Sequence, residues 1–80
     1  MKIAGYEGVD IPIEEIKFIE LAAVQLEATP EELRKIATFL NTAADDMDSM
    51  GSVYDHEHLS DKQPGFENSP YVVILRSPTN

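Results

Sequence analysis

Apolar and polar residues follow a helical period between residues 30 and 50. The apolar positions recur every three or four residues: Leu33, Ile36, Ala37, Leu40, Ala44 and Met47. This spacing predicts an amphipathic helix with Leu40 in its buried stripe, while Phe39 and Ala43 fall at the edge of that stripe. Truncating Leu40 to alanine is therefore expected to destabilise the fold.

Both ends of this helix carry recognisable signals. Thr29 and Glu32 have the spacing of a capping box, and Pro30 suits the first helical position because it has no N–H to leave unpaired. Gly51 is suited to end the helix, although acidic residues near that end oppose the helix dipole. The helix is therefore expected to begin at Pro30 and to end near Met50.

The remaining segments are shorter. Residues 1–6 are typical of a strand, and the apolar run Tyr71-Val-Val-Ile-Leu-Arg76 predicts a buried strand. Residues 16–27 fit both a period of two and a period of 3.6, and the alternation that runs into the helix cap favours a strand. Residues 51–70 are polar and turn-forming, which predicts a long loop.

Together these elements predict a single domain over residues 1–80 of the α+β class. We expect a two-layer sandwich in which a small, antiparallel-rich sheet of about three strands has one main helix packed on one face. Such a sheet has exposed edges, and an exposed edge can pair with another chain. A homodimer therefore remains open at this stage.

Charge narrows the class of partner. Fifteen acidic residues against six lysines and arginines give a formal net charge of −9, which argues against nucleic-acid binding and favours a basic partner. Solubility alone is the plainer explanation of this acidity. The chain has no apolar run near the roughly 20 residues that a membrane span needs, and no signal-peptide pattern. We therefore expect a cytoplasmic protein that does not associate with membranes.

The sequence contains no catalytic signature. It has no cysteine, its serines lie in no Gly-x-Ser-x-Gly elbow, and it has no glycine-rich phosphate loop. His56 and His58 are two residues apart, so on an extended segment both rings point the same way and can share a metal ion with a nearby carboxylate. A third histidine is missing, which favours a solvated loop instead. The sequence predicts no enzyme, no cofactor and no metal.

Acidic residues run from the end of the predicted helix into the following loop, interleaved with aromatic and methionine residues. This mixture suits recognition of a basic protein, because charge accelerates encounter while aromatic side chains supply contact area. A merely solvated loop is the alternative. The candidate partner-binding residues are Asp45, Asp46, Asp48, Tyr54, Asp55, His56, Glu57 and His58.

Several of these stretches resemble the immunity protein 32 family of bacterial polymorphic toxin systems. The resemblance rests on Val24-Gln-Leu-Glu-Ala-Thr-Pro-Glu-Glu-Leu33, Ile36-Ala-Thr-Phe39, Ala43-Ala-Asp-Asp-Met47 and Asp55-His-Glu-His-Leu59. It implies a cytoplasmic protein that binds a cognate toxin and blocks it without catalysis. Under this reading the acidic residues imitate phosphates, while Tyr54 and the histidines anchor the complex. The alternative is a small structural or regulatory subunit that assembles through an exposed sheet edge.

Overall fold

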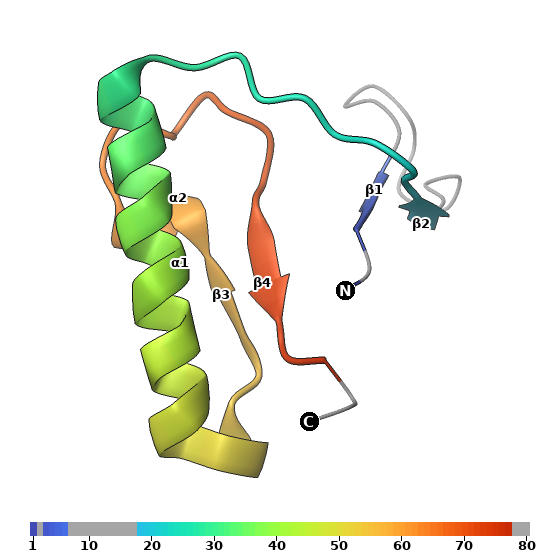
Figure 1. The fold of residues 1–80 in the computed structure, drawn as a ribbon, viewed down its shortest axis with the longest axis vertical. Helices are drawn as coiled ribbons and strands as arrows, with labels where there is room; N and C mark the ends of the chain where they lie inside the picture. Colours follow the sequence, from blue (N-terminus) through green and yellow to red (C-terminus); the bar gives the residue numbers. More distant parts are fainter. Residues whose placement is uncertain (2, 7–17, 78–80) are drawn as a thin grey trace.

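The structure, a computed structural model, describes residues 1, 3–6 and 18–77 (Figure 1). It contains one long helix, α1, one short helix, α2, and four short strands. The elements in chain order are β1 (Ala4–Tyr6), β2 (Phe18–Glu20), α1 (Pro30–Met50), a 3-10 helix (Gly51–Val53), β3 (His56–His58), α2 (Leu59–Lys62) and β4 (Val73–Leu75). The predicted α+β class, with one main helix and antiparallel strands, is confirmed.

Helix α1 begins and ends where the sequence predicts. The Thr29 hydroxyl accepts a hydrogen bond from the Glu32 backbone N–H at 3.1 Å, and the Glu32 carboxylate accepts one from the Thr29 N–H at 2.8 Å. Pro30 occupies the first turn. At the other end Gly51 adopts a φ of 59° and donates its N–H to the Met47 carbonyl. Glycine tolerates this positive φ, which explains why the helix stops here.

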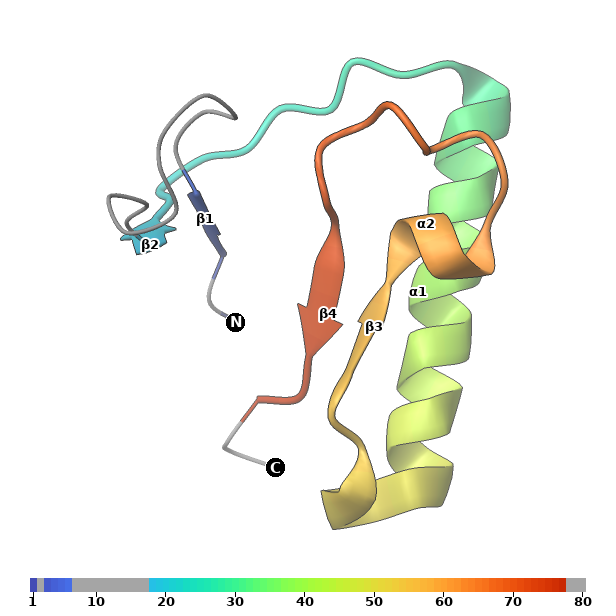
Figure 2. The same ribbon diagram turned by 180° about the vertical axis from the view of Figure 1, so that it is seen from behind.

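The described strands form two antiparallel pairs. Gly5 lies opposite Ile19 in the β1–β2 pair, and Glu57 lies opposite Ile74 in the β3–β4 pair. Figures 1 and 2 show α1 alongside the β3–β4 hairpin, with β1 and β2 on the far side of β4. The radius of gyration is 13.9 Å, against about 12 Å for a compact domain of this length. The fold is therefore more open than a closed sandwich.

The core lies between α1 and the chain that follows it. Phe39 of α1 packs with Leu59 and Phe66, and Ile36 and Ile74 pack against this cluster. Two long-range hydrogen bonds hold the same layers together: Lys35 Nζ donates to the Pro64 carbonyl at 3.2 Å, and Arg76 donates to the Met47 carbonyl at 3.0 Å.

The buried face of α1 differs from the predicted one. Phe39 and Ala43 are 1% and 2% exposed, whereas Leu33 and Leu40 are each 45% exposed. The placement of Leu40 in the core is therefore wrong. Apolar residues form an arc of nearly half of the circumference of this helix, which is wider than the stripe that is buried, so their period identifies a helix without deciding which part of the arc packs.

Three other expectations need correction. The predicted strand over residues 16–27 is ordered as β2 only at residues 18–20, residues 21–29 have no regular structure, and residues 16 and 17 lie outside the described residues. The predicted loop at 51–70 contains the 3-10 helix, β3 and α2, each too short to show a period. Strand β4 is half-covered, because Ile74 packs against the core cluster while Val73 and Leu75 are exposed.

Candidate functional site

Strand β3 divides the predicted partner-binding residues between two faces of the hairpin. Side chains alternate along a strand, so His56 and His58 share one face and Glu57 occupies the other. Glu57 lies opposite Ile74, which packs against the core under α1. Residues paired across an antiparallel ladder share a face. Glu57 therefore faces α1, and the histidines face away from it.

On the inner face, Glu57 meets Asp46 of α1. The hydrogen bond between these two carboxyl groups raises the pKa of Glu57, burial and the Asp46 charge raise it further, and Lys62 opposes the shift. One oxygen of the Glu57 carboxyl, Oε2, is buried and has no hydrogen-bond partner among the described residues. Two carboxyl groups in contact hold a shared proton more readily than two negative charges.

Tyr54 packs beside this pair, and we call Asp46, Tyr54 and Glu57 the inner cluster. Its side chain is 6% exposed, and its hydroxyl is buried without a hydrogen-bond partner among the described residues. Burial raises the pKa of this phenol, and the charges of Glu57 and Asp46 raise it further. Tyr54 is thus packed inside the protein next to the acid pair, and does not present its ring to solvent as an anchor for a partner.

The outer face carries the two histidines. His56 Nδ1 lies 2.8 Å from Asp55 Oδ2, and the His56 and His58 rings meet edge to face with centroids 5.1 Å apart. The His58 ring in turn meets Tyr71 with a centroid separation of 6.2 Å. The rings lie side by side, as an extended segment predicts. Among the described residues no group of three or more metal-binding side chains comes together.

The exposed side of α1, which begins next to the buried stripe, carries a different surface. Apolar residues lie along it at intervals of four and three residues, and Asp48 continues the row, with Asp45 beside it. All of these positions are exposed. We call the set the α1 outer face: Leu33, Ala37, Leu40, Ala44, Asp45 and Asp48. Sequence reasoning missed its apolar part because it assigned those residues to the core.

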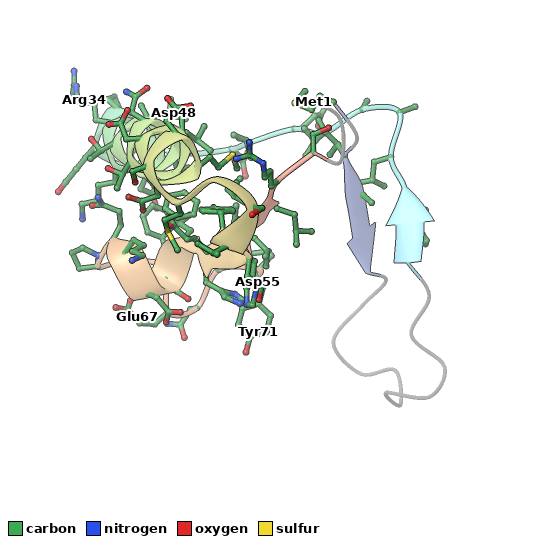
Figure 3. The ribbon with its side chains drawn as sticks, turned by 90° about the horizontal axis from the view of Figure 1, so that it is seen from below. Met1, Arg34, Asp48, Asp55, Glu67 and Tyr71 are labelled. Carbon is green, nitrogen blue, oxygen red and sulfur yellow. The ribbon has the colours of Figure 1, made fainter. Side chains whose placement is uncertain are left out.

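The carboxylates of Asp45 and Asp48 are free to meet a partner. Neither side chain forms an ion pair or a hydrogen bond with another described residue. Figure 3 shows Asp48 on the helix, with Asp55 and Tyr71 on the opposite side of the hairpin. The eight predicted residues therefore form three groups, namely two on the α1 outer face, three in the inner cluster and three on the outer face of β3.

A groove of about 430 Å³ lies between the segment that precedes α1 and the end of the hairpin. Apolar side chains dominate its lining, including Leu21, Leu26 and Phe66, and Glu27 and Glu32 are its charged residues. None of the predicted partner-binding residues lines it. In the part of the chain that the structure describes, no helix is long and apolar enough to cross a membrane.

Comparison with known proteins gives the family. No curated protein and no solved structure matches the chain. The family model described as immunity protein 32 matches residues 23–77. The match spans α1, α2 and the β3–β4 hairpin, and begins after β1 and β2. It therefore contains both the α1 outer face and the inner cluster. Because this match covers well over half of the 80 residues, the chain belongs to the immunity protein 32 family.

Proposed function

We propose that this protein binds a cognate bacterial toxin in the cytoplasm and neutralises it through the α1 outer face, without catalysis of its own. Membership of an immunity protein family supports a toxin partner. The carboxylates of Asp45 and Asp48 carry the proposal further, because they are exposed and have no cationic partner among the described residues. Unpaired charges of one sign favour a partner of the other sign.

The composition of the surface fits a protein partner. Leu33 and Leu40 are each 45% exposed, so a partner that covers them gains from the removal of apolar surface from water. Asp45 and Asp48 stand at one end of this apolar row, where they can steer a basic partner during encounter. A centre of apolar contacts with charges at its border is the usual anatomy of a protein–protein interface.

A basic toxin gives the mechanism. Enzymes that act on polyanions carry clustered lysines and arginines, and those groups also bind carboxylates. Docking of the α1 outer face would place Asp45 and Asp48 where the phosphates of such a substrate would lie. Inhibition then follows from occupation of the site. Asp55, His56 and His58 lie on the side of the hairpin that faces away from α1, so they do not belong to the α1 outer face. Their part in toxin binding is a separate prediction.

Affinity capture tests the proposal. The tagged protein is used to recover partners from the source cell lysate, and the recovered toxin is then produced and its association rate measured at low and high salt. Reversing the charges of Asp45 and Asp48 to lysine should slow association at low salt while leaving the fold intact. These reversals also remove negative charge from a helix C-terminus, where it is unfavourable.

The matched control is Asp61→Lys, since Asp61 is an exposed carboxylate on α2, away from the α1 outer face. Asp61→Lys changes the net charge by the same amount as Asp45→Lys or Asp48→Lys alone, so the control is compared with each single reversal. An equal effect of the control would show that net charge alone governs binding. Recovery of no toxin-like protein would contradict the proposed function itself.

A further inference from the structure

The groove beside β4 is bounded by two non-helical stretches of backbone. Residues 24–28, which precede α1, all line it, and so do residues 70–72, which lead into β4. Side chains alternate between the two sides of an extended chain, so consecutive residues can all line a groove where the edge of the backbone faces it. Figures 1 and 2 show both stretches at the end of the fold where α1 begins. Both walls of the groove therefore present backbone edges.

The backbone groups on these walls are available for pairing. No N–H or C=O group from residue 22 to residue 27 forms a hydrogen bond with another described residue. On the second wall the Val72 carbonyl accepts a hydrogen bond from the Leu59 N–H at 2.9 Å, which directs the backbone groups of Val72 toward β3. This orientation alternates along a strand, so Tyr71 directs its N–H and C=O groups to the other side, where the groove lies. A chain that enters the groove can therefore bond to the backbone.

The side chains that line the groove are apolar and acidic. Val24 is 55% and Leu26 62% exposed on the first wall, and Phe66 extends the apolar lining toward the core. Glu27 and Glu32 are the charged residues, and no lysine or arginine is among the described residues that line the groove. A ligand that covers these walls gains from apolar burial and from a positive charge placed near the carboxylates.

We propose that this groove binds an extended segment of another protein, which pairs its backbone with residues 22–27 and carries apolar side chains and a lysine or arginine. Addition of a strand to a free backbone edge is a known mode of peptide recognition, in which the main chain gives affinity and the side chains give specificity. The basic side chain would reach Glu27. None of the α1 outer face residues lines the groove, so this inference goes beyond the proposed function and does not rest on it.

The unpaired backbone selects a peptide over a small apolar molecule. The groove volume of about 430 Å³ lies within the usual range of ligand sites, so its size suits either class of ligand. Only a ligand with amide groups can cover the apolar wall and also replace the water on residues 22–27 with hydrogen bonds. An acidic segment is disfavoured, because it would bring like charges close to Glu27 and Glu32.

Isothermal titration calorimetry of the full-length protein with a synthetic peptide tests the proposal. The probe is a six-residue peptide of alternating valine and lysine with blocked ends, which extends over about 20 Å at about 3.3 Å per residue. We expect saturable binding that protects the amides of residues 22–27 from hydrogen exchange. The same peptide methylated at every backbone nitrogen cannot donate hydrogen bonds, and its dissociation constant should be at least tenfold higher.

Reversing the charge of Glu27 tests the electrostatic part. Glu27→Lys should raise the dissociation constant of the valine–lysine peptide about tenfold, and should allow a peptide of alternating valine and glutamate to bind in its place. The matched control is Asp61→Lys, which makes the same change of charge on α2, outside the groove. Both residues are exposed, so both variants are expected to fold, and far-ultraviolet circular dichroism checks this.

Absence of binding up to millimolar concentrations of the valine–lysine peptide would overturn the proposal. Equal binding of the methylated peptide would do so too, since the groove would then accept apolar cations without backbone pairing. An equal loss of affinity in Asp61→Lys would show attraction by net charge alone and would also overturn it. None of these outcomes depends on whether the α1 outer face binds a toxin.

Discussion

Neighbouring residues on α1 give the sharpest test of the packing. Phe39 is 1% exposed and lies in the core cluster with Leu59 and Phe66, whereas Leu40 is 45% exposed on the α1 outer face. We expect Phe39→Ala to lower the free energy of unfolding by about 3–5 kcal/mol, through lost burial and the cavity left behind. Leu40→Ala leaves no enclosed cavity and loses about half of the transfer energy of a leucine side chain, which is about 1.5 kcal/mol or less.

The total stability of an 80-residue domain makes this difference easy to measure. At about 0.05–0.15 kcal/mol per residue the whole fold is worth about 4–12 kcal/mol, so Phe39→Ala should remove a large share of the stability while Leu40→Ala removes little. Urea denaturation followed by far-ultraviolet circular dichroism, at one fixed protein concentration, measures both variants. Phe39→Ala gains more in helix propensity than Leu40→Ala, so propensity reduces the expected difference and does not create it. Equal losses, or a larger loss at Leu40, would show that the buried face of α1 is assigned to the wrong side.

Four further substitutions test local features. Thr29→Ala removes half of the capping box and should cost about 1 kcal/mol in urea denaturation. The backbone N–H of Thr29, followed by its hydroxyl, lowers the pKa of Glu32, so this carboxylate stabilises the fold above its ordinary pKa and stops doing so as the pH falls through the lowered value. Glu32→Gln removes the titrating group, so a variant whose stability depends on pH in the acid range as the parent's does would contradict this. The hydrogen bond to Asp46 instead raises the pKa of Glu57, so the folded state holds that proton more tightly and loses stability as the pH rises from the ordinary pKa through the raised one. Glu57→Gln should remove this loss of stability. A thermal midpoint of the variant with the same pH dependence as that of the parent protein would refute the acid pair. Gly51→Ala adds a β-carbon to a residue whose φ is positive, and because nothing lies within 4 Å of that carbon, the cost is backbone strain and not a clash. The substitution should lower the free energy of unfolding by about 1–3 kcal/mol. An unchanged stability would mean that the helix ends without this backbone conformation.

The helix boundaries could be predicted because their signals are local. Thr29, Pro30 and Glu32 form the cap through bonds that span three residues, and Gly51 ends the helix through its own φ. The buried side of α1 could not be predicted, because Phe39 and Leu40 are both apolar and only the position of the hairpin distinguishes them. Contact with the hairpin determines which side of α1 is buried, and the period of the apolar residues alone does not predict that contact.

The candidate site shows the same division. His56 and His58 lie side by side as two residues of separation on an extended segment require, although residues 51–70 were predicted as a loop and strand β3 was not predicted. Their separation from the acidic residues was not predicted. The sequence places Glu57 between the histidines, and the pleat then turns it toward Asp46 on α1. Residues that are adjacent in the chain therefore belong to opposite surfaces, and a cluster in sequence is a poor guide to a cluster in space when it crosses a strand.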